Sequence, residues 1–160
     1  MGVTCSPQRL IRQPSECQGV VVDVIVLIGR ILFCFLFLTS GYAHFAQRKG
    51  MAQYAGSRGV PMPMPAVLGG GVLLVAGGLM VLLGIWADLG ALLLVVFLLP
   101  TAVLVHGFWK DKDPQSRQME IVQFSKDTAL AGASLMLFAL FSFAGHDLGL
   151  MITGPLFNIS

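Results

Sequence analysis

The residues that could do chemistry in this sequence are the few ionisable side chains that interrupt long apolar segments. Arg30 lies within the first of these segments, and a charge at the centre of a bilayer costs roughly 2.5–3.5 kcal/mol. Asp23 precedes it by two helical turns, which is about 10 Å along one helix face. Two interpretations stay open. Arg30 either locks the fold through an internal salt bridge or backbone carbonyls, or it forms part of a site for an anion or a quinone oxygen.

A second group of polar residues becomes a site only if the apolar segments are antiparallel helices. The ends of the first and third segments would then meet the start of the fourth at one level. That arrangement brings together His44, His106, Lys126 and Asp127. Two histidines beside a carboxylate can relay protons, contact a quinone or bind a metal. No HxxxH spacing fixes a metal geometry, so we expect no metal, and interfacial histidines bound to water or carbonyls are the commoner case.

The composition identifies the elements that must position these residues. Of 160 residues, 56% are hydrophobic and 11% are charged, against roughly 25% charged in an ordinary soluble domain. This excludes a soluble protein, and a net charge of +2 gives no reason to expect a nucleic-acid partner. Windows long enough to cross a bilayer as helices, about 20 residues each, lie at about 20–45, 65–87, 89–109 and 126–145.

Helices are the expected structure because an open sheet in lipid would leave its backbone groups unpaired. The sequence therefore predicts an all-α, polytopic membrane protein that folds as a compact antiparallel bundle of four transmembrane helices. Residues 1–19 form an extramembrane segment, residues 20–147 the transmembrane domain, and residues 148–160 an interfacial tail. Asp113 and Pro114 are typical of a helix start, so the fourth helix is expected to begin early with an amphipathic part.

Glycines in the second segment indicate where helices pack closely. Gly70, Gly77 and Gly84 recur at seven-residue spacing, which gives one helix face a nearly bare backbone. Small residues let transmembrane helices approach each other. This face can serve packing within the bundle or contact with another subunit, and the sequence does not decide between them.

Positive charges predict the orientation, because Lys and Arg concentrate in cytoplasmic loops. Two basic residues, Arg9 and Arg12, precede the first segment. Seven others lie in the loops after the first and third segments: Arg48, Lys49, Arg58, Lys110, Lys112, Arg117 and Lys126. We therefore expect cytoplasmic loops and external termini. An external compartment permits a disulfide between Cys5 and Cys17, whereas the opposite orientation would leave them as free thiols.

Four motifs occur in order over about residues 28–140: GRILFCFLFLTSGYAHF, a proline followed by a glycine-rich segment, HGFW, and QFSKDTALAGASLML. Together they resemble the DoxX family of small bacterial membrane proteins. The resemblance implies a four-helix bundle. It also implies that the functional residues include those at matching family positions: Arg30, His106, Trp109 and Lys126. The chain departs from the family in His44, where a lysine is usual, and in Asp127, where asparagine is usual. Trp109 by itself is more typical of a membrane anchor than of a ligand contact.

Some DoxX members resemble the membrane subunit of thiosulfate:quinone oxidoreductase or associate with thiol-handling enzymes. The resemblance thus implies a component of a membrane-bound redox assembly, linked to a quinone or to thiol and sulfur chemistry, in a bacterial plasma membrane. The expected partners are lipid and other membrane redox proteins, or further copies of the chain. A quinone is the possible cofactor, and none is expected to be covalently bound. The alternative is a non-catalytic bundle subunit that anchors or stabilises a larger complex. No motif of known enzyme mechanics occurs, so the sequence leaves open whether the protein is an enzyme.

Overall fold

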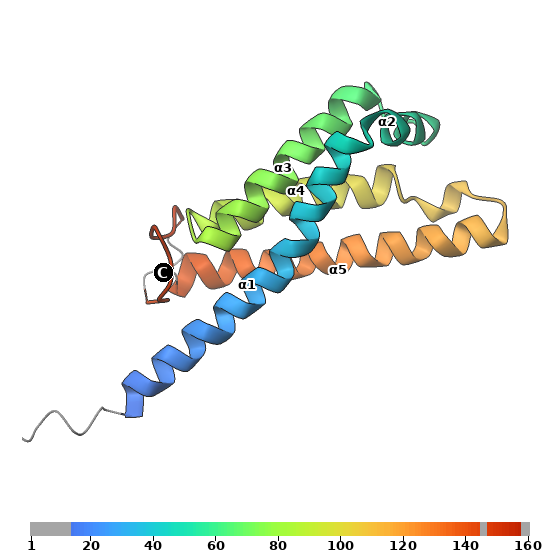
Figure 1. Ribbon diagram of the computed structural model, residues 1–160. Coiled ribbons are helices and arrows are strands. Elements are labelled where there is room, and N and C mark those ends of the chain that lie inside the picture. Colours follow the sequence, from blue (N-terminus) through green and yellow to red (C-terminus); the bar gives the residue numbers. More distant parts are fainter. Residues whose placement is uncertain (1–13, 145–146, 158–160) are drawn as a thin grey trace, which may run out of the picture.

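The structure is a computed structural model that describes residues 14–144 and 147–157, with side chains from residue 19 onward. Its described part consists of helices and connecting turns (Figure 1). The elements are α1 (Pro14–Ala46), α2 (Arg48–Ser57), α3 (Pro63–Leu83), α4 (Ala87–Leu104), the short 3-10 helix η2 (Phe108–Lys110) and α5 (Pro114–Ala144). Four helical stretches are long and apolar enough to cross a bilayer: Gly19–Ala46, Pro63–Leu83, Ala87–Lys110 and Pro114–Ala144. The predicted all-α fold with four membrane-spanning helices is confirmed.

The spanning helices pack in chain order. α3 lies against both α1 and α4, and α4 lies against α5. Within the described residues no Cα atom of α1 comes within 8 Å of one in α5. The first turns of α1 also extend past the ends of the other helices (Figure 1). The backbones of the first and last spans are therefore separated from each other. Side chains occupy or line the space between them.

Glycines of α3 allow its close packing on both neighbours. A Cβ atom on Gly77 would lie 2.9 Å from the carbonyl oxygen of Gly90 in α4, and one on Gly70 would lie 2.6 Å from the ring of Phe97. Both glycines are buried inside the bundle. Gly84 has a different role, because it ends α3 in a left-handed conformation with φ 68°. The glycine face is thus used within the molecule at Gly70 and Gly77, and it does not extend to Gly84.

Several helix boundaries differ from the predicted ones. α3 ends at Leu83 rather than near 87 because the left-handed Gly84 stops it. α4 ends at Leu104, and the chain continues to residue 110 through η2. α5 begins at Pro114, where the Asp113 carboxylate accepts a hydrogen bond from the backbone N–H of Ser116 at 2.8 Å. The early start of the last helix follows from the helix-start signal at Asp113.

α2 lies within the stretch that was expected to be a loop between the first two spans. Its mean hydropathy is low, so it carries no signal of a membrane span. Ala52 and Ala55 nevertheless pack against Val67 of α3 in a small apolar cluster. We call the end of the molecule that holds α2, η2 and the start of α5 the loop end.

The segment 147–157 closes the opposite end of the bundle. The backbone N–H groups of Ile152 and Thr153 donate to the carbonyl oxygen of Gly84, at 3.2 and 3.0 Å. The backbone N–H of Phe157 donates to the buried carboxylate of Asp88 at 2.6 Å. This segment, predicted to be an interfacial tail, packs directly on the turn between α3 and α4.

Candidate functional site

Arg30 binds backbone carbonyls at the tail-covered end. Its Nε donates to Val81 O at 2.8 Å, Nη2 to Leu82 O at 2.5 Å, and Nη1 to Leu150 O at 3.0 Å. The residue is only 2% exposed. These contacts match the interpretation in which Arg30 binds backbone carbonyls. They connect α1 to α3 and to the tail.

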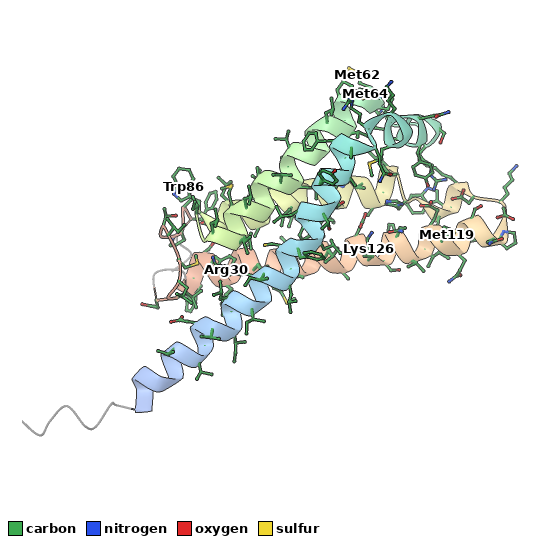
Figure 2. All side chains as sticks on the ribbon, viewed as in Figure 1. Arg30, Met62, Met64, Trp86, Met119 and Lys126 are labelled. Carbon is green, nitrogen blue, oxygen red and sulfur yellow. The ribbon has the colours of Figure 1, made fainter. Side chains whose placement is uncertain are left out.

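Asp23 does not pair with Arg30. Its Oδ1 accepts a hydrogen bond from the backbone N–H of Gly149 at 2.8 Å. Arg30 lies level with the end of α3, because it binds the carbonyl oxygens of Val81 and Leu82 in the last turn of that helix. Figure 2 shows Arg30 toward the tail-covered end and Lys126 toward the loop end. Arg30 is therefore remote from the other candidate residues.

A cavity of about 560 Å³ lies at the loop end, and we call it the loop-end cavity. Side chains from all five α-helices line it. Its apolar walls include Leu36, Phe37, Leu74, Phe97 and Leu130, and its polar lining includes His44, Tyr54, His106, Lys126 and Asp127. The structure thus brings together the four residues His44, His106, Lys126 and Asp127 that antiparallel helices were expected to place at one level.

His106 connects the cavity to a carboxylate behind it. Its Nδ1 lies 2.9 Å from Oε2 of Glu120, and because an ionised carboxylate only accepts hydrogen bonds, Nδ1 carries the proton. Its Nε2 lies 3.9 Å from Oδ2 of Asp127, which is too long for a hydrogen bond. Both His106 and Asp127 line the cavity. Nε2 thus has no hydrogen-bond partner among the described residues.

His44 presents a similar arrangement from α1. Its Nδ1 lies 2.8 Å from the carbonyl oxygen of Ser40, so Nδ1 is the protonated nitrogen. The ring meets that of Phe97 edge to face, with centroids 5.6 Å apart. The chain thereby holds the imidazole in one orientation at the cavity wall.

Lys126 and Asp127 partly offset each other's charge. The Nζ atom of Lys126 lies 3.7 Å from Oδ1 of Asp127 and 2.5 Å from Oε1 of Gln123. The Asp127 side chain is 7% exposed, whereas that of Lys126 is 46% exposed. The cavity therefore contains a buried carboxylate with a cation at its rim, which disfavours a free anion.

Trp109 lies outside the loop-end cavity. Its ring packs edge to face against Phe108 and Phe124 at centroid distances of 5.2 and 6.0 Å, and the residue is 53% exposed. Aromatic side chains of this kind are common at the membrane interface. The structure gives Trp109 a packing role at the surface.

Three residues at the site were not identified from the sequence: Tyr54, Arg58 and Glu120. The Tyr54 hydroxyl donates to Oε1 of Glu120. Burial, followed by this hydrogen bond, raises the pKa of Tyr54 to about 12. Tyr54 therefore stays protonated near neutral pH and serves as a hydrogen-bond donor.

Arg58 was counted only as a loop charge. Its Nη1 and Nη2 each lie 2.9 Å from an oxygen of Asp111, and Nε donates to Val105 O at 2.7 Å. The hydrogen bonds with Asp111 raise the pKa of Arg58. Its Nη2 also lies 3.7 Å from Glu120. A positive charge thus lies beside the carboxylate that binds His106.

Of the three cysteine side chains, the structure describes only that of Cys34. Cys5, and the side chain of Cys17, lie outside the described residues, so their pairing stays a prediction. Cys34 is a buried free thiol in the core. Among the described side chains, no group of three His, Cys, Asp or Glu residues is placed to hold a metal ion.

These features define a small multi-pass membrane protein with a mostly apolar cavity, lined in part by polar residues, at one end of its helical bundle. The chain belongs to the DoxX family, whose model matches residues 25–107. It is 32% identical to inner membrane protein YphA of Escherichia coli K12 over 119 residues, covering 74% of this chain and 84% of that protein. It is 33% identical to inner membrane protein YqjF of the same organism over 116 residues, covering 72% and 82%. No solved structure matches the chain.

Proposed function

We propose that this protein is a membrane component of a membrane-bound redox assembly and that its loop-end cavity binds the ring of a quinone. The observation that supports this proposal is the division of the cavity into apolar walls and a polar group of residues. Its volume of about 560 Å³ is typical of small-molecule sites, which range over about 300–1,000 Å³.

The chemistry of the lining favours a quinone over an anion. A quinone ring is flat and apolar, and its two carbonyl oxygens only accept hydrogen bonds. Phe37 and Phe97 supply apolar surface, and the ammonium group of Lys126 supplies a hydrogen-bond donor at the rim. An anionic sulfur compound would instead meet the carboxylate of Asp127, which is close to fully buried.

The separation of α1 from α5 supports entry from the bilayer. Leu36 and Ser40 of α1 face the same cavity as Leu130 of α5, although the two helices make no close backbone contact. A ligand with an apolar tail can therefore keep that tail between the two helices while its ring reaches the polar residues.

We propose further that the loop end faces the cytoplasm. The basic residues that favour this orientation follow α1 or surround η2, and both regions lie at one end of the bundle. A periplasmic reporter fused to the carboxyl terminus would be active in this orientation. An inactive reporter in a fully expressed fusion protein would instead place the carboxyl terminus in the cytoplasm.

The alternative function, a non-catalytic subunit, was linked to the glycine face of α3. Gly70 and Gly77 are occupied by contacts with α4, so this face is not free for a partner. A stoichiometric protein partner without bound quinone would nevertheless favour the alternative.

The test is to purify the protein with its native lipids and to measure extracted quinone. We expect quinone in the wild type and at least a tenfold smaller amount in His106→Leu. Trp109→Phe, which changes an aromatic residue outside the cavity, is the matched control and should retain the quinone. A quinone content equal to that of bulk membrane lipid in all three proteins would contradict the proposal.

A further inference from the structure

Polar contacts connect the loop-end cavity to the surface of the loop end. Nε2 of His106 faces the cavity side, and Nδ1 of the same ring binds Glu120 at 2.9 Å. Glu120 in turn accepts the hydrogen bond from the Tyr54 hydroxyl. The Glu120 side chain is 13% exposed and Tyr54 is 41% exposed. A proton thus has a short polar route between solvent and the imidazole.

The hydrogen bond to Glu120 limits what Nε2 can do. Because Nδ1 already carries the proton of a neutral ring, Nε2 is then an acceptor. A ligand oxygen that only accepts hydrogen bonds cannot bind to that nitrogen. It can bind if the ring gains a second proton and becomes an imidazolium, and histidine is the side chain that changes charge near neutral pH.

Carboxylates lie on both sides of the His106 ring. On α5, Glu120 lies at Nδ1 and Asp127 lies on the Nε2 side. Two carboxylates thus flank one ring, so the positive charge that a second proton brings has an acidic group near each ring nitrogen. Lys126, on the same helix, is half exposed and lies beside Asp127.

Groups on the other elements also lie close to this site. From α2, Tyr54 is neutral, and Arg58 at its end is positive but is paired with Asp111 at 2.9 Å. From α1, His44 lines the same cavity. Its Nδ1 is bound to a backbone carbonyl, so it does not compete for Glu120.

We propose that binding of a carbonyl-bearing ligand in the loop-end cavity is coupled to the uptake of one proton by His106, with Glu120 as the positioning residue. The proton comes from solvent at the loop end and forms the second N–H bond of the ring. No electron moves in this step, and no bond of the ligand breaks. The inference rests on the proposed function, because the quinone carbonyl is the group that accepts the new hydrogen bond.

The test uses the full-length protein in detergent and decylubiquinone as the probe. Proton uptake on binding is measured in weakly buffered solution at pH 8, and the dissociation constant is measured between pH 6 and 8.5. We expect about one proton per bound ligand and a Kd that rises by up to about tenfold per pH unit at the alkaline end. The wild type should show both effects.

Two variants separate this coupling from a structural role. Glu120→Gln should bind with less than half of the proton uptake and a flatter pH profile, and His106→Gln should show no uptake at this site. The matched control is Glu16→Gln, which removes the other glutamate of the sequence and should keep the wild-type uptake. Thermal unfolding of each variant checks that it is folded. If Glu120→Gln does not fold, His106→Gln decides the question.

The possible failures are distinguishable. Binding of decylubiquinone by the wild type without proton uptake would overturn the inference and leave the proposed function in place. Unchanged uptake in a folded Glu120→Gln or His106→Gln protein would also overturn it. No binding by the wild type at any pH would overturn both.

Discussion

Arg58 and Asp111 form a two-point ion pair in which Nη1 and Nη2 each lie 2.9 Å from one carboxylate oxygen. The pair joins the end of α2 to the residue that follows η2. Bidentate geometry of this kind fixes both direction and distance. The Arg58 side chain is 9% exposed. This contact therefore holds the two loop segments that enclose the back of the cavity.

Arg58→Gln should destabilise the loop end. The change leaves Asp111 without its cation and removes donors from the carbonyls of Val105 and Gly107, so we expect a loss of about 2–3 kcal/mol in the free energy of unfolding. Arg58→Lys should fall between this variant and the wild type, because it keeps the charge but loses the forked geometry. Denaturant unfolding in mixed micelles measures the difference. Arg48→Gln, at an exposed arginine nearby, is the control, and an equal loss in that variant would contradict a specific role for the pair.

Arg30→Ala should affect stability rather than ligand binding. Its three guanidinium nitrogens donate to main-chain carbonyls, and their loss should cost about 2–4 kcal/mol. The protein that remains folded should bind decylubiquinone with an unchanged Kd, because Arg30 is remote from the loop-end cavity. Unfolding and binding measured on the same preparation test both statements. A large loss of affinity at wild-type stability would instead make Arg30 a ligand-binding residue.

Gly77→Ala should weaken the contact between α3 and α4. The new methyl group would lie 2.9 Å from the carbonyl oxygen of Gly90, so the helices must move apart, and overpacking of this kind costs about 1–3 kcal/mol. Gly132→Ala is the matched control, because a methyl group at this position of α5 would have no atom within 4 Å beyond its own stretch of helix. That substitution should be neutral or stabilise the helix by up to about 1 kcal/mol. Equal effects of the two substitutions on the melting temperature would argue against the close approach of α3 and α4.

Asp113 should contribute to stability in a pH-dependent way. Hydrogen bonds from Ser116 lower the pKa of Asp113 in the folded protein. A lowered pKa means that its contribution is present above the unfolded value, about 3.9, and is lost as the pH falls through the folded value. The difference in melting temperature between the wild type and Asp113→Ala should therefore be constant from pH 5 to 7 and shrink below about pH 4. A difference that grows on acidification would contradict this account.

Hydrophobic length and charge were sufficient to predict the spans and the level of the polar group. His44, His106, Lys126 and Asp127 line one cavity, as expected from four antiparallel spans. Lys126 and Asp127 nevertheless lie about three turns inside α5 rather than at its start. These relations depend only on distance along the chain and on the thickness of the bilayer. The sequence carries this information without any knowledge of side-chain contacts.

The residues behind the cavity could not be predicted in the same way. Tyr54 and Glu120 are 66 positions apart, and each lies in a polar segment without a membrane signal. Their contact depends on how α2 folds back on α3, which is decided by small apolar contacts at Ala52 and Val67. The role of Arg30 could not be predicted either. Its partners are backbone carbonyl oxygens, which every residue type has, so the sequence does not mark their positions.

The contact between Arg30 and Leu150 has a consequence for the biosynthesis of the protein. The two residues are separated by 120 positions, and a ribosome adds about 5–20 residues per second. Roughly 6–24 s therefore pass between the synthesis of Arg30 and that of Leu150. During that interval the guanidinium must be solvated by water, lipid head groups or the insertion machinery. Docking of residues 147–157 is thus a late event in assembly, and it completes the burial of a charge that entered the membrane first.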